Sequence, residues 1–124
     1  MITKLVLIAL GSGLGGVCRW LLSKSVHVSW LSVFPWGTFV VNILGCLAIG
    51  LIYGLIDRGV SLSENMRLFL TVGFCGGFTT FSTFMHENYL LFNTPQFITI
   101  ALYAGLSFFV GLLFVYLGYL ITSF

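Results

Sequence analysis

Hydrophobic and polar positions separate along the chain on the scale of whole segments, with four long apolar stretches joined by short polar ones. The apolar stretches run over Leu5 to Leu22, Trp36 to Ile56, Leu68 to Phe92, and Phe97 to Thr122. At about 1.5 Å of rise per residue, each stretch is long enough as a helix to cross a hydrocarbon core of roughly 30 Å. The pattern therefore predicts an all-α membrane protein, with four transmembrane helices in a single domain over residues 1–124.

The composition places the chain in a bilayer rather than in water. Of the 124 residues, 59% are hydrophobic and 6% are charged, whereas soluble domains carry about 25% charged residues. The net charge of +2 is too small, and the basic residues are too scattered, to indicate a nucleic-acid partner. The three cysteines, Cys18, Cys46 and Cys75, each fall inside an apolar stretch. That placement indicates packing residues rather than disulfides or metal ligands.

The segment GSGLGG at 11–16 fits the dinucleotide-binding pattern G-x-G-x-x-G. That pattern requires an acidic residue about 20 positions later, in a soluble βαβ unit. Here the first acidic residue comes only after the second apolar stretch, so we expect no nucleotide partner. The spacing of four between Gly11 and Gly15, and between Gly50 and Gly54, instead predicts faces on which membrane helices pack closely.

The basic residues are divided almost evenly between the two sides of the membrane. With four spans, Lys4, Arg58 and Arg67 fall on one side, and Arg19 and Lys24 fall on the other. An asymmetry of Lys and Arg between loops normally sets the orientation of a membrane protein. So weak a bias permits insertion in both orientations, and hence an antiparallel dimer. The alternative is that even a weak bias fixes one orientation.

The third apolar stretch contains GFCGGFTTFSTF at 73–84, in which glycines and hydroxyl residues stand between phenylalanines. Glycines are where a helix most easily kinks or unwinds, and we expect a break over Gly76 to Thr80. An unwound turn exposes carbonyls that need a partner inside a bilayer, and a cation held by backbone oxygens would satisfy them. The alternative is a helix kinked at Gly76 and Gly77, whose hydroxyls bond back to its own preceding turn.

Other polar residues inside the spans are candidates either for contacts between helices or for an ion pathway. Asn42 lies within the second span, where a lone asparagine ordinarily joins two helices. Arg19 either extends to the headgroups or supplies positive potential at an ion entrance. Glu87 is placed near the membrane surface, at the exit of such a path. A polar stripe with a spacing of four on the fourth helix consists of Thr99, Tyr103 and Ser107.

These groups suit a small anion better than a chemical reaction. The edges of phenyl rings are positively polarised, and Phe81 and Phe84 stand one turn apart, with Thr80 on the face of Phe84. Hydroxyl groups and the Asn42 amide donate hydrogen bonds that can replace an anion's hydration shell. The sequence shows no nucleophile–base pair and no buried carboxylate placed for proton coupling. A passive anion pathway therefore follows more naturally than an enzyme or a pump.

At these residues the chain resembles the Fluc family of fluoride ion channels, also called the CrcB family. The matching motifs are GSGLGGVCRW in the first span, GTFVVNILG in the second and GFCGGFTTFSTF in the third. They occur in the order found in the family, and the four-span length covers the whole chain. The resemblance implies an antiparallel, dual-topology homodimer with two fluoride pathways in the bacterial cytoplasmic (inner) membrane. It implies export of fluoride from the cytoplasm, driven by a negative-inside potential, which reduces fluoride toxicity.

The resemblance also implies roles for individual residues. Phe81 and Phe84 match the paired phenylalanines whose ring edges face fluoride, and Asn42 matches the pore asparagine. Arg19 matches the vestibule arginine. The polar tracks along the pathway are matched by Ser82, Thr83, Tyr103 and Ser107. The backbone carbonyls that hold a structural Na⁺ between the two subunits are matched by those of Gly76 and Thr79. The chain departs from the pattern at Gly111, where another hydroxyl would continue the fourth-helix track.

Two other classes of membrane protein have a similar length. A small dual-topology multidrug transporter is expected to carry a buried glutamate in its first span, but residues 1–30 contain no Asp or Glu. A purely structural membrane subunit also needs glycine-rich packing, but it leaves the dense cluster of Thr, Ser and Phe unexplained. Ion flux through the purified protein separates the structural reading from a channel.

Overall fold

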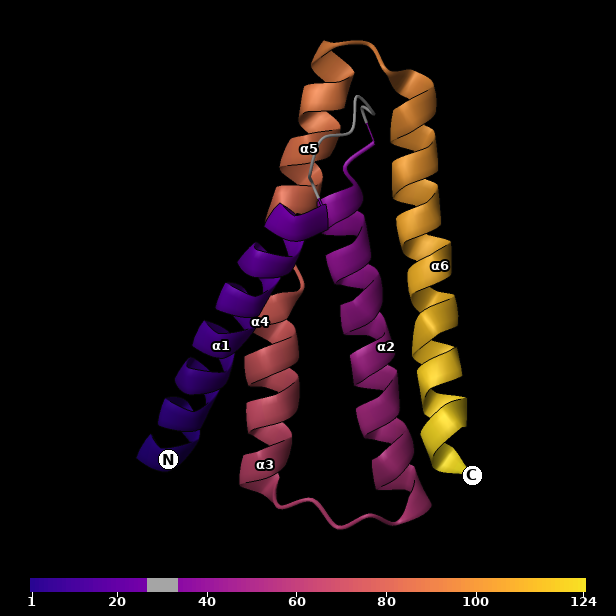
Figure 1. Ribbon diagram of the computed structural model, residues 1–124. Coiled ribbons are helices and arrows are strands. Elements are labelled where there is room, and N and C mark those ends of the chain that lie inside the picture. Colours follow the sequence, from indigo (N-terminus) through magenta and orange to yellow (C-terminus); the bar gives the residue numbers. More distant parts are fainter. Residues whose placement is uncertain (27–33) are drawn as a thin grey trace.

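The computed structural model describes residues 1–26 and 34–124, and the regular structure of these residues is helical (Figure 1). Its elements are α1 (Ile2–Val26), α2 (Trp36–Arg58), α3 (Glu64–Leu68), the π-helical segment η1 (Phe69–Cys75), α4 (Gly76–Phe78), α5 (Ser82–Asn93) and α6 (Phe97–Ser123). Among the described residues, four helical segments are long and apolar enough to cross a membrane, and the third of them joins α3, η1, α4 and α5 over Glu64–Asn93. The four predicted spans are therefore confirmed.

The loop between the second and third spans is set by local sequence. Helix α2 ends at Arg58 and is capped by Gly59, whose φ of 103° lies in the left-handed region that glycine tolerates. The N–H groups of Gly59 and Val60 then close the last turn of the helix. Helix α3 begins at Glu64 and is capped by Ser63, whose hydroxyl accepts a hydrogen bond of 3.1 Å from the Met66 N–H.

The spans pack as two close pairs, with α1 along η1 and α4, and α2 along α6 (Figure 1). In the first pair the two backbones touch at glycines. A Cβ atom at Gly15 would overlap the carbonyl of Phe74, and one at Gly77 would overlap the backbone of Ser12. The predicted packing face at Gly11 and Gly15 is confirmed, because both residues are buried against this partner.

The second pair follows the same rule. A Cβ atom at Gly50 would overlap the Val115 carbonyl, and one at Gly54 would overlap the carbonyl of Tyr119. The Thr122 hydroxyl adds a hydrogen bond of 2.8 Å to the carbonyl of Leu51. Small residues thus allow close contact of helix backbones, where dispersion and hydrogen bonds rather than the hydrophobic effect hold membrane helices together.

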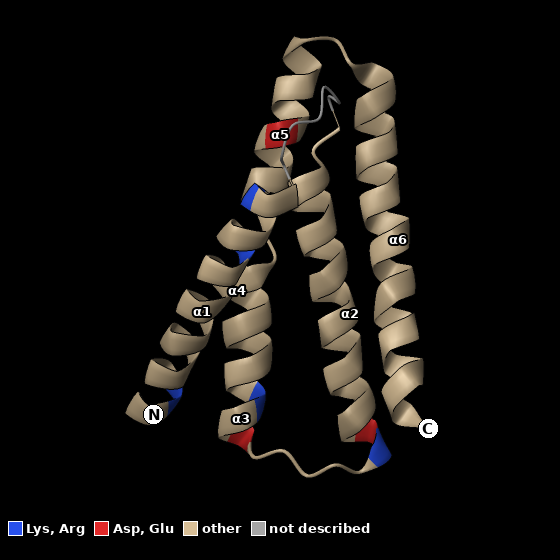
Figure 2. Cartoon of the chain, in the orientation of Figure 1, with Lys and Arg blue, Asp and Glu red and all other residues tan. Residues whose placement is uncertain are grey.

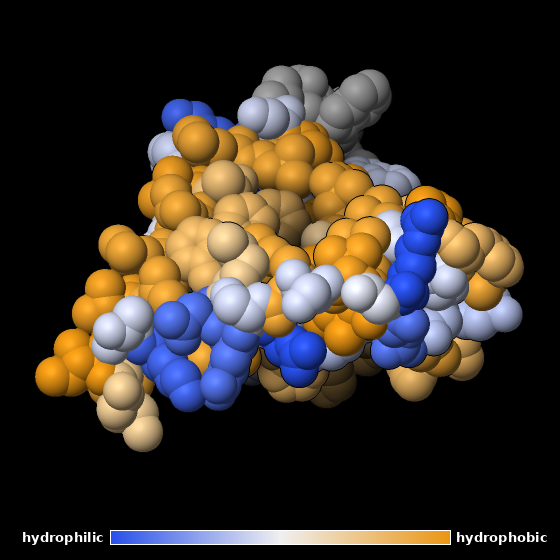
Figure 3. Space-filling model, turned by 90° about the horizontal axis from the view of Figure 1, so that it is seen from below, coloured by the Kyte–Doolittle hydropathy of each residue, from blue (hydrophilic) through white to orange (hydrophobic). Residues whose placement is uncertain are grey.

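Charged side chains gather at one end of the bundle and around the C-terminal half of α1 and the helix α5 (Figure 2). At the end that carries both termini, Lys4 pairs with Glu64 at 2.8 Å, and the Tyr119 hydroxyl donates to Asp57 at 2.6 Å. Seen from this end, hydrophilic residues are exposed among apolar ones (Figure 3). The two helix pairs diverge toward this end and approach each other near α5 (Figure 1).

The close approach at Gly15 generates a prediction about assembly. We expect Gly15→Val to reduce the yield of folded protein sharply, because the added side chain would separate α1 from α4 by overpacking that costs about 1–3 kcal/mol or more. The matched control is Gly13→Val on the same helix, since a Cβ atom at Gly13 meets nothing within 4 Å. Size-exclusion chromatography of both variants in detergent measures the difference, and equal yields would contradict the packing role.

Candidate functional site

The helix of the third span is interrupted over Thr79, Thr80 and Phe81. Thr79 has an extended backbone, with ψ of 159°, so its carbonyl turns away from the direction of the helical carbonyls before it. The predicted break is confirmed, but it begins three residues later than expected. Gly76 and Gly77 are both helical, and Gly77 serves the close approach of α1 rather than the unwinding.

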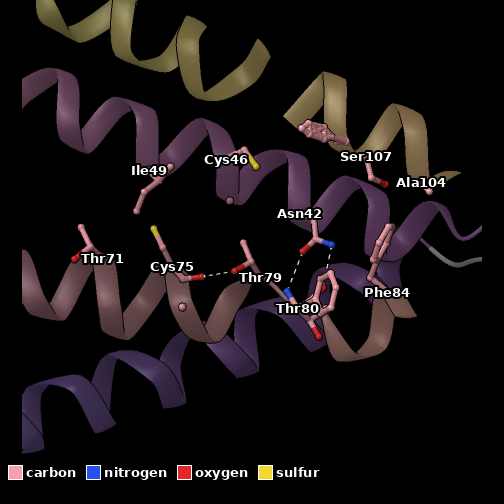
Figure 4. Close-up of a pocket in the computed structure, with 14 residues that line it drawn as sticks. Asn42, Cys46, Ile49, Thr71, Cys75, Thr79, Thr80, Phe84, Ala104 and Ser107 are labelled. Carbon is pink, nitrogen blue, oxygen red and sulfur yellow. Dashed lines mark hydrogen bonds between the residues drawn. The ribbon is translucent and has the colours of Figure 1, made fainter. Parts of the chain in front are cut away.

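The break removes helical hydrogen bonds, and side chains take their place. In an unbroken helix the Thr80 N–H would bond to the Gly76 carbonyl. It bonds instead to Oδ1 of Asn42 at 2.9 Å, and Nδ2 of Asn42 donates to the Thr80 carbonyl at 3.2 Å (Figure 4). A side chain of α2 thus holds both polar groups of one residue in the third span.

Two further contacts replace helical bonds on either side of this residue. The Gly77 carbonyl accepts a hydrogen bond of 3.3 Å from Nε of Arg19, which brings a cation from α1 to the C-terminal end of α4. The Thr83 N–H donates to the Thr80 hydroxyl at 3.3 Å and so gives the first turn of α5 a partner. Arg19 is half-buried, and it contacts the third span rather than only reaching outward.

Two phenylalanines lie together where the third span resumes, Phe81 as the last residue of the break and Phe84 in the first turn of α5. The ring centroids of Phe81 and Phe84 are 6.0 Å apart with the planes tilted by 40°, and Phe84 also lies 4.8 Å from the ring of Tyr103. Phe84 is half-buried, whereas Phe81 is 72% exposed in the single chain. The structure therefore brings three aromatic rings of two spans into one group.

Glu87 joins α5 to two other spans. Its carboxylate accepts a hydrogen bond of 3.0 Å from the Thr38 hydroxyl on α2 and one of 2.8 Å from the Tyr103 hydroxyl on α6. Tyr103 is fully buried. Thr38 was not among the predicted site residues. Its position four residues before Asn42, on the same face of α2, is the sequence feature that indicates it.

A cavity of about 650 Å³ lies between the third span and the α2–α6 pair (Figure 4). Of the predicted site residues, those that line it are Asn42, Gly76, Thr79, Thr80, Phe81, Phe84 and Ser107. The predicted residues that do not line it are Arg19, Ser82, Thr83, Glu87 and Tyr103. The lining residues without a predicted pathway role are Gly45, Cys46, Ile49, Thr71, Cys75, Ala104 and Phe108. Most of the lining residues without a predicted role are apolar, so the pattern of polar residues in the sequence did not indicate them.

The polar lining of the cavity is sparse. The Ser107 hydroxyl is buried and has no hydrogen-bond partner among the described residues. The Thr79 hydroxyl, by contrast, bonds back to the Cys75 carbonyl at 2.9 Å. Gly111, one turn beyond Ser107, faces α2, where a Cβ atom would lie 3.3 Å from Sγ of Cys46. The fourth-helix track therefore meets a packed helix contact at Gly111.

Known proteins resemble this chain in sequence through all four spans. A family model described as "CrcB-like protein, Camphor Resistance (CrcB)" matches residues 6–119. A protein of Azobacteroides pseudotrichonymphae, named fluoride-specific ion channel FluC, is 41% identical over 124 residues, which is 100% of this chain and 99% of that protein. A protein of the same name from Phocaeicola vulgatus is 46% identical over 115 residues, covering 93% and 94% of the two chains. One from Nitratidesulfovibrio vulgaris is 44% identical over 115 residues, or 93% of each. Because the match runs through every span, this chain belongs to the CrcB family.

Proposed function

We propose that this chain forms a passive, fluoride-selective channel that exports fluoride from the bacterial cytoplasm across the inner membrane. The observation that carries the proposal is membership of the CrcB family, since relatives that align over the whole chain are named fluoride-specific ion channels. The four apolar spans supply the membrane location that such a channel needs. A negative-inside potential drives an anion outward, so the protein needs no coupled energy source.

The chemistry of the cavity supports an anion as the transported ion. The Ser107 hydroxyl has no partner within residues 1–26 and 34–124 and can donate, and the Asn42 amide keeps one N–H after bonding to Thr80. The rings of Phe81 and Phe84 line the same cavity and can turn polarised edges toward an anion. We assign the pathway to these four residues, continued by Thr80, Ser82, Thr83, Tyr103 and Glu87, with Arg19 supplying positive potential at the vestibule.

The working unit in this proposal is an antiparallel homodimer with two pathways. Phe81 is 72% exposed although it belongs to the aromatic group at the break, and a second copy would cover it. The basic residues support two orientations, because Lys4, Arg58 and Arg67 on one side are nearly balanced by Arg19 and Lys24 on the other.

A structural Na⁺ between the two copies completes the proposal. The ligands of the Na⁺ would be the backbone carbonyl oxygens of Gly76 and Thr79, which are of the kind that hard cations prefer. The fit rests on two observations. The Gly76 carbonyl has lost its helical donor because the Thr80 N–H bonds to Asn42. The Thr79 carbonyl is turned out of the helix direction. Bound Na⁺ would supply positive charge that neutralises these carbonyl dipoles.

Fluoride efflux from liposomes tests the channel and its aromatic residues. We expect wild-type protein to release fluoride rapidly while chloride is retained, under a K⁺ shunt. Phe81→Ile and Phe84→Ile should each lower fluoride efflux by about tenfold or more, because an aliphatic side chain has no polarised ring edge to offer the anion.

The matched control is Phe109→Ile, a residue of α6 that is 71% exposed and lies outside the cavity lining. Its efflux should equal that of the wild type. Full efflux in both the Phe81 and Phe84 variants would contradict the ring-edge role, and absence of fluoride efflux from folded wild-type dimer would contradict the channel itself.

Sodium removal tests the cation separately. Replacing Na⁺ with N-methylglucamine at constant ionic strength should shift the protein in detergent from dimer toward its 13.7 kDa protomer, because unneutralised carbonyls at the interface would repel each other. Light scattering coupled to size-exclusion chromatography measures the mass. Thr79→Ser keeps the carbonyl and should keep the dimer in Na⁺. An unchanged dimer after Na⁺ removal would refute a structural cation.

A further inference from the structure

We propose that Asn42 is a positioning residue that holds the third span open, by taking the Thr80 N–H away from the Gly76 carbonyl. The inference rests on the proposed function, because the break that Asn42 holds contains the Phe81 and Thr79 positions assigned above. It adds a task for Asn42 that is distinct from contact with the transported anion. The freed carbonyl and the direction of Phe81 are both consequences of this one side-chain contact.

The hydrogen-bond geometry shows a two-point attachment. Oδ1 of Asn42 accepts from the Thr80 N–H at 2.9 Å, and Nδ2 donates to the Thr80 carbonyl at 3.2 Å. A primary amide offers an acceptor oxygen and a donor nitrogen on neighbouring atoms without charge, and its two bonds fix which way the amide is turned. The same residue therefore satisfies a donor and an acceptor that the bilayer would leave unpaired.

Close approach of α2 makes so short a side chain sufficient. Gly45 lies one turn after Asn42, and a Cβ atom there would overlap the Thr79 methyl group. The glycine thus lets α2 contact the break directly. From the other side, Arg19 of α1 bonds to the Gly77 carbonyl, so the turn before Thr80 is also held.

The exposure of Phe81 explains why the backbone has to be held. A side chain that is 72% exposed within the protomer cannot be oriented by packing inside that protomer, apart from its contact with Phe84. Its direction is set by the backbone, and the residue immediately before it is Thr80. Fixing both polar groups of Thr80 therefore fixes the backbone position from which the Phe81 side chain extends.

The test is NMR of the dimer in detergent micelles, with threonine labelled by ¹⁵N and glycine labelled at the carbonyl carbon. In Asn42→Ala we expect the Thr80 N–H to lose its partner and exchange with solvent about tenfold faster. If the N–H returns to Gly76 instead, the Gly76 carbonyl resonance will shift, and the inference is supported equally. In Asn42→Asp an acceptor oxygen remains, so Thr80 should keep the exchange rate of the wild type.

The control is Asn93→Ala, which removes an amide from an exposed position at the end of α5 and should leave both signals unchanged. A folded Asn42→Ala dimer with an unchanged Thr80 exchange rate and an unchanged Gly76 resonance would overturn the inference. Exchange of the Thr80 N–H that is about tenfold faster than in the wild type in both the Asp and the Ala variants would also overturn it. Neither readout requires ion flux, so failure of the wild type to release fluoride would refute the proposed function alone.

Discussion

Inside a bilayer, a backbone N–H or carbonyl that loses its helical partner has no water to replace it, and the structure around Thr79–Phe81 depends on this constraint. The break is supported by Asn42 from α2, by Arg19 from α1 and by the Thr80 hydroxyl within the segment itself. Two of these groups come from other spans, so those spans must lie within hydrogen-bonding distance of the third. Glycines provide that proximity, because a side chain at Gly15, Gly45 or Gly77 would collide with its neighbour. Helix packing and the break are therefore parts of one arrangement.

The same arrangement provides two kinds of polar group. Carbonyls freed or turned by the break are electron-rich and suit a cation, whereas the hydroxyl, amide and ring-edge groups that line the cavity are donors and suit an anion. Helix α5 resumes directly after the break, so Phe84 takes its position from α5, whereas Phe81 takes its position from the break itself. Helix α5 is also held at Glu87, which accepts hydrogen bonds from Thr38 and Tyr103 on two different helices. A rigidly held α5 is what an ion pathway requires, since a displaced ring would alter a path built for a small ion.

Local pattern was enough to predict the spans, the glycine packing faces and the existence of a break. The four spans follow from long apolar stretches, and Gly11, Gly15, Gly50 and Gly54 follow from their spacing. The start of the break was predicted three residues too early, because the flexibility of Gly76 and Gly77 was taken as its cause. Gly77 is small so that α1 can pack against it. The partners Asn42–Thr80 and Thr38–Glu87 are far apart in sequence and arise from tertiary contact. The apolar lining at Ile49 and Phe108 carries no signal that separates it from lipid-facing residues. The pathway and cation roles of individual residues remain predictions.

The single chain leaves part of its own polar chemistry uncovered, and this bears on assembly. Lipid tails can cover Phe81, but they cannot bond to the Gly76 carbonyl or to the buried Ser107 hydroxyl. Ions and a second copy of the chain would satisfy both needs together, the copy by closing the exposed aromatic group and the ions by occupying the unpaired donors and acceptors. In an antiparallel pair, the weak charge bias between the two ends ceases to matter, because each membrane face then receives one of each end. The proposed dimer and its ions would together meet a single need, which is created by breaking a helix inside a membrane.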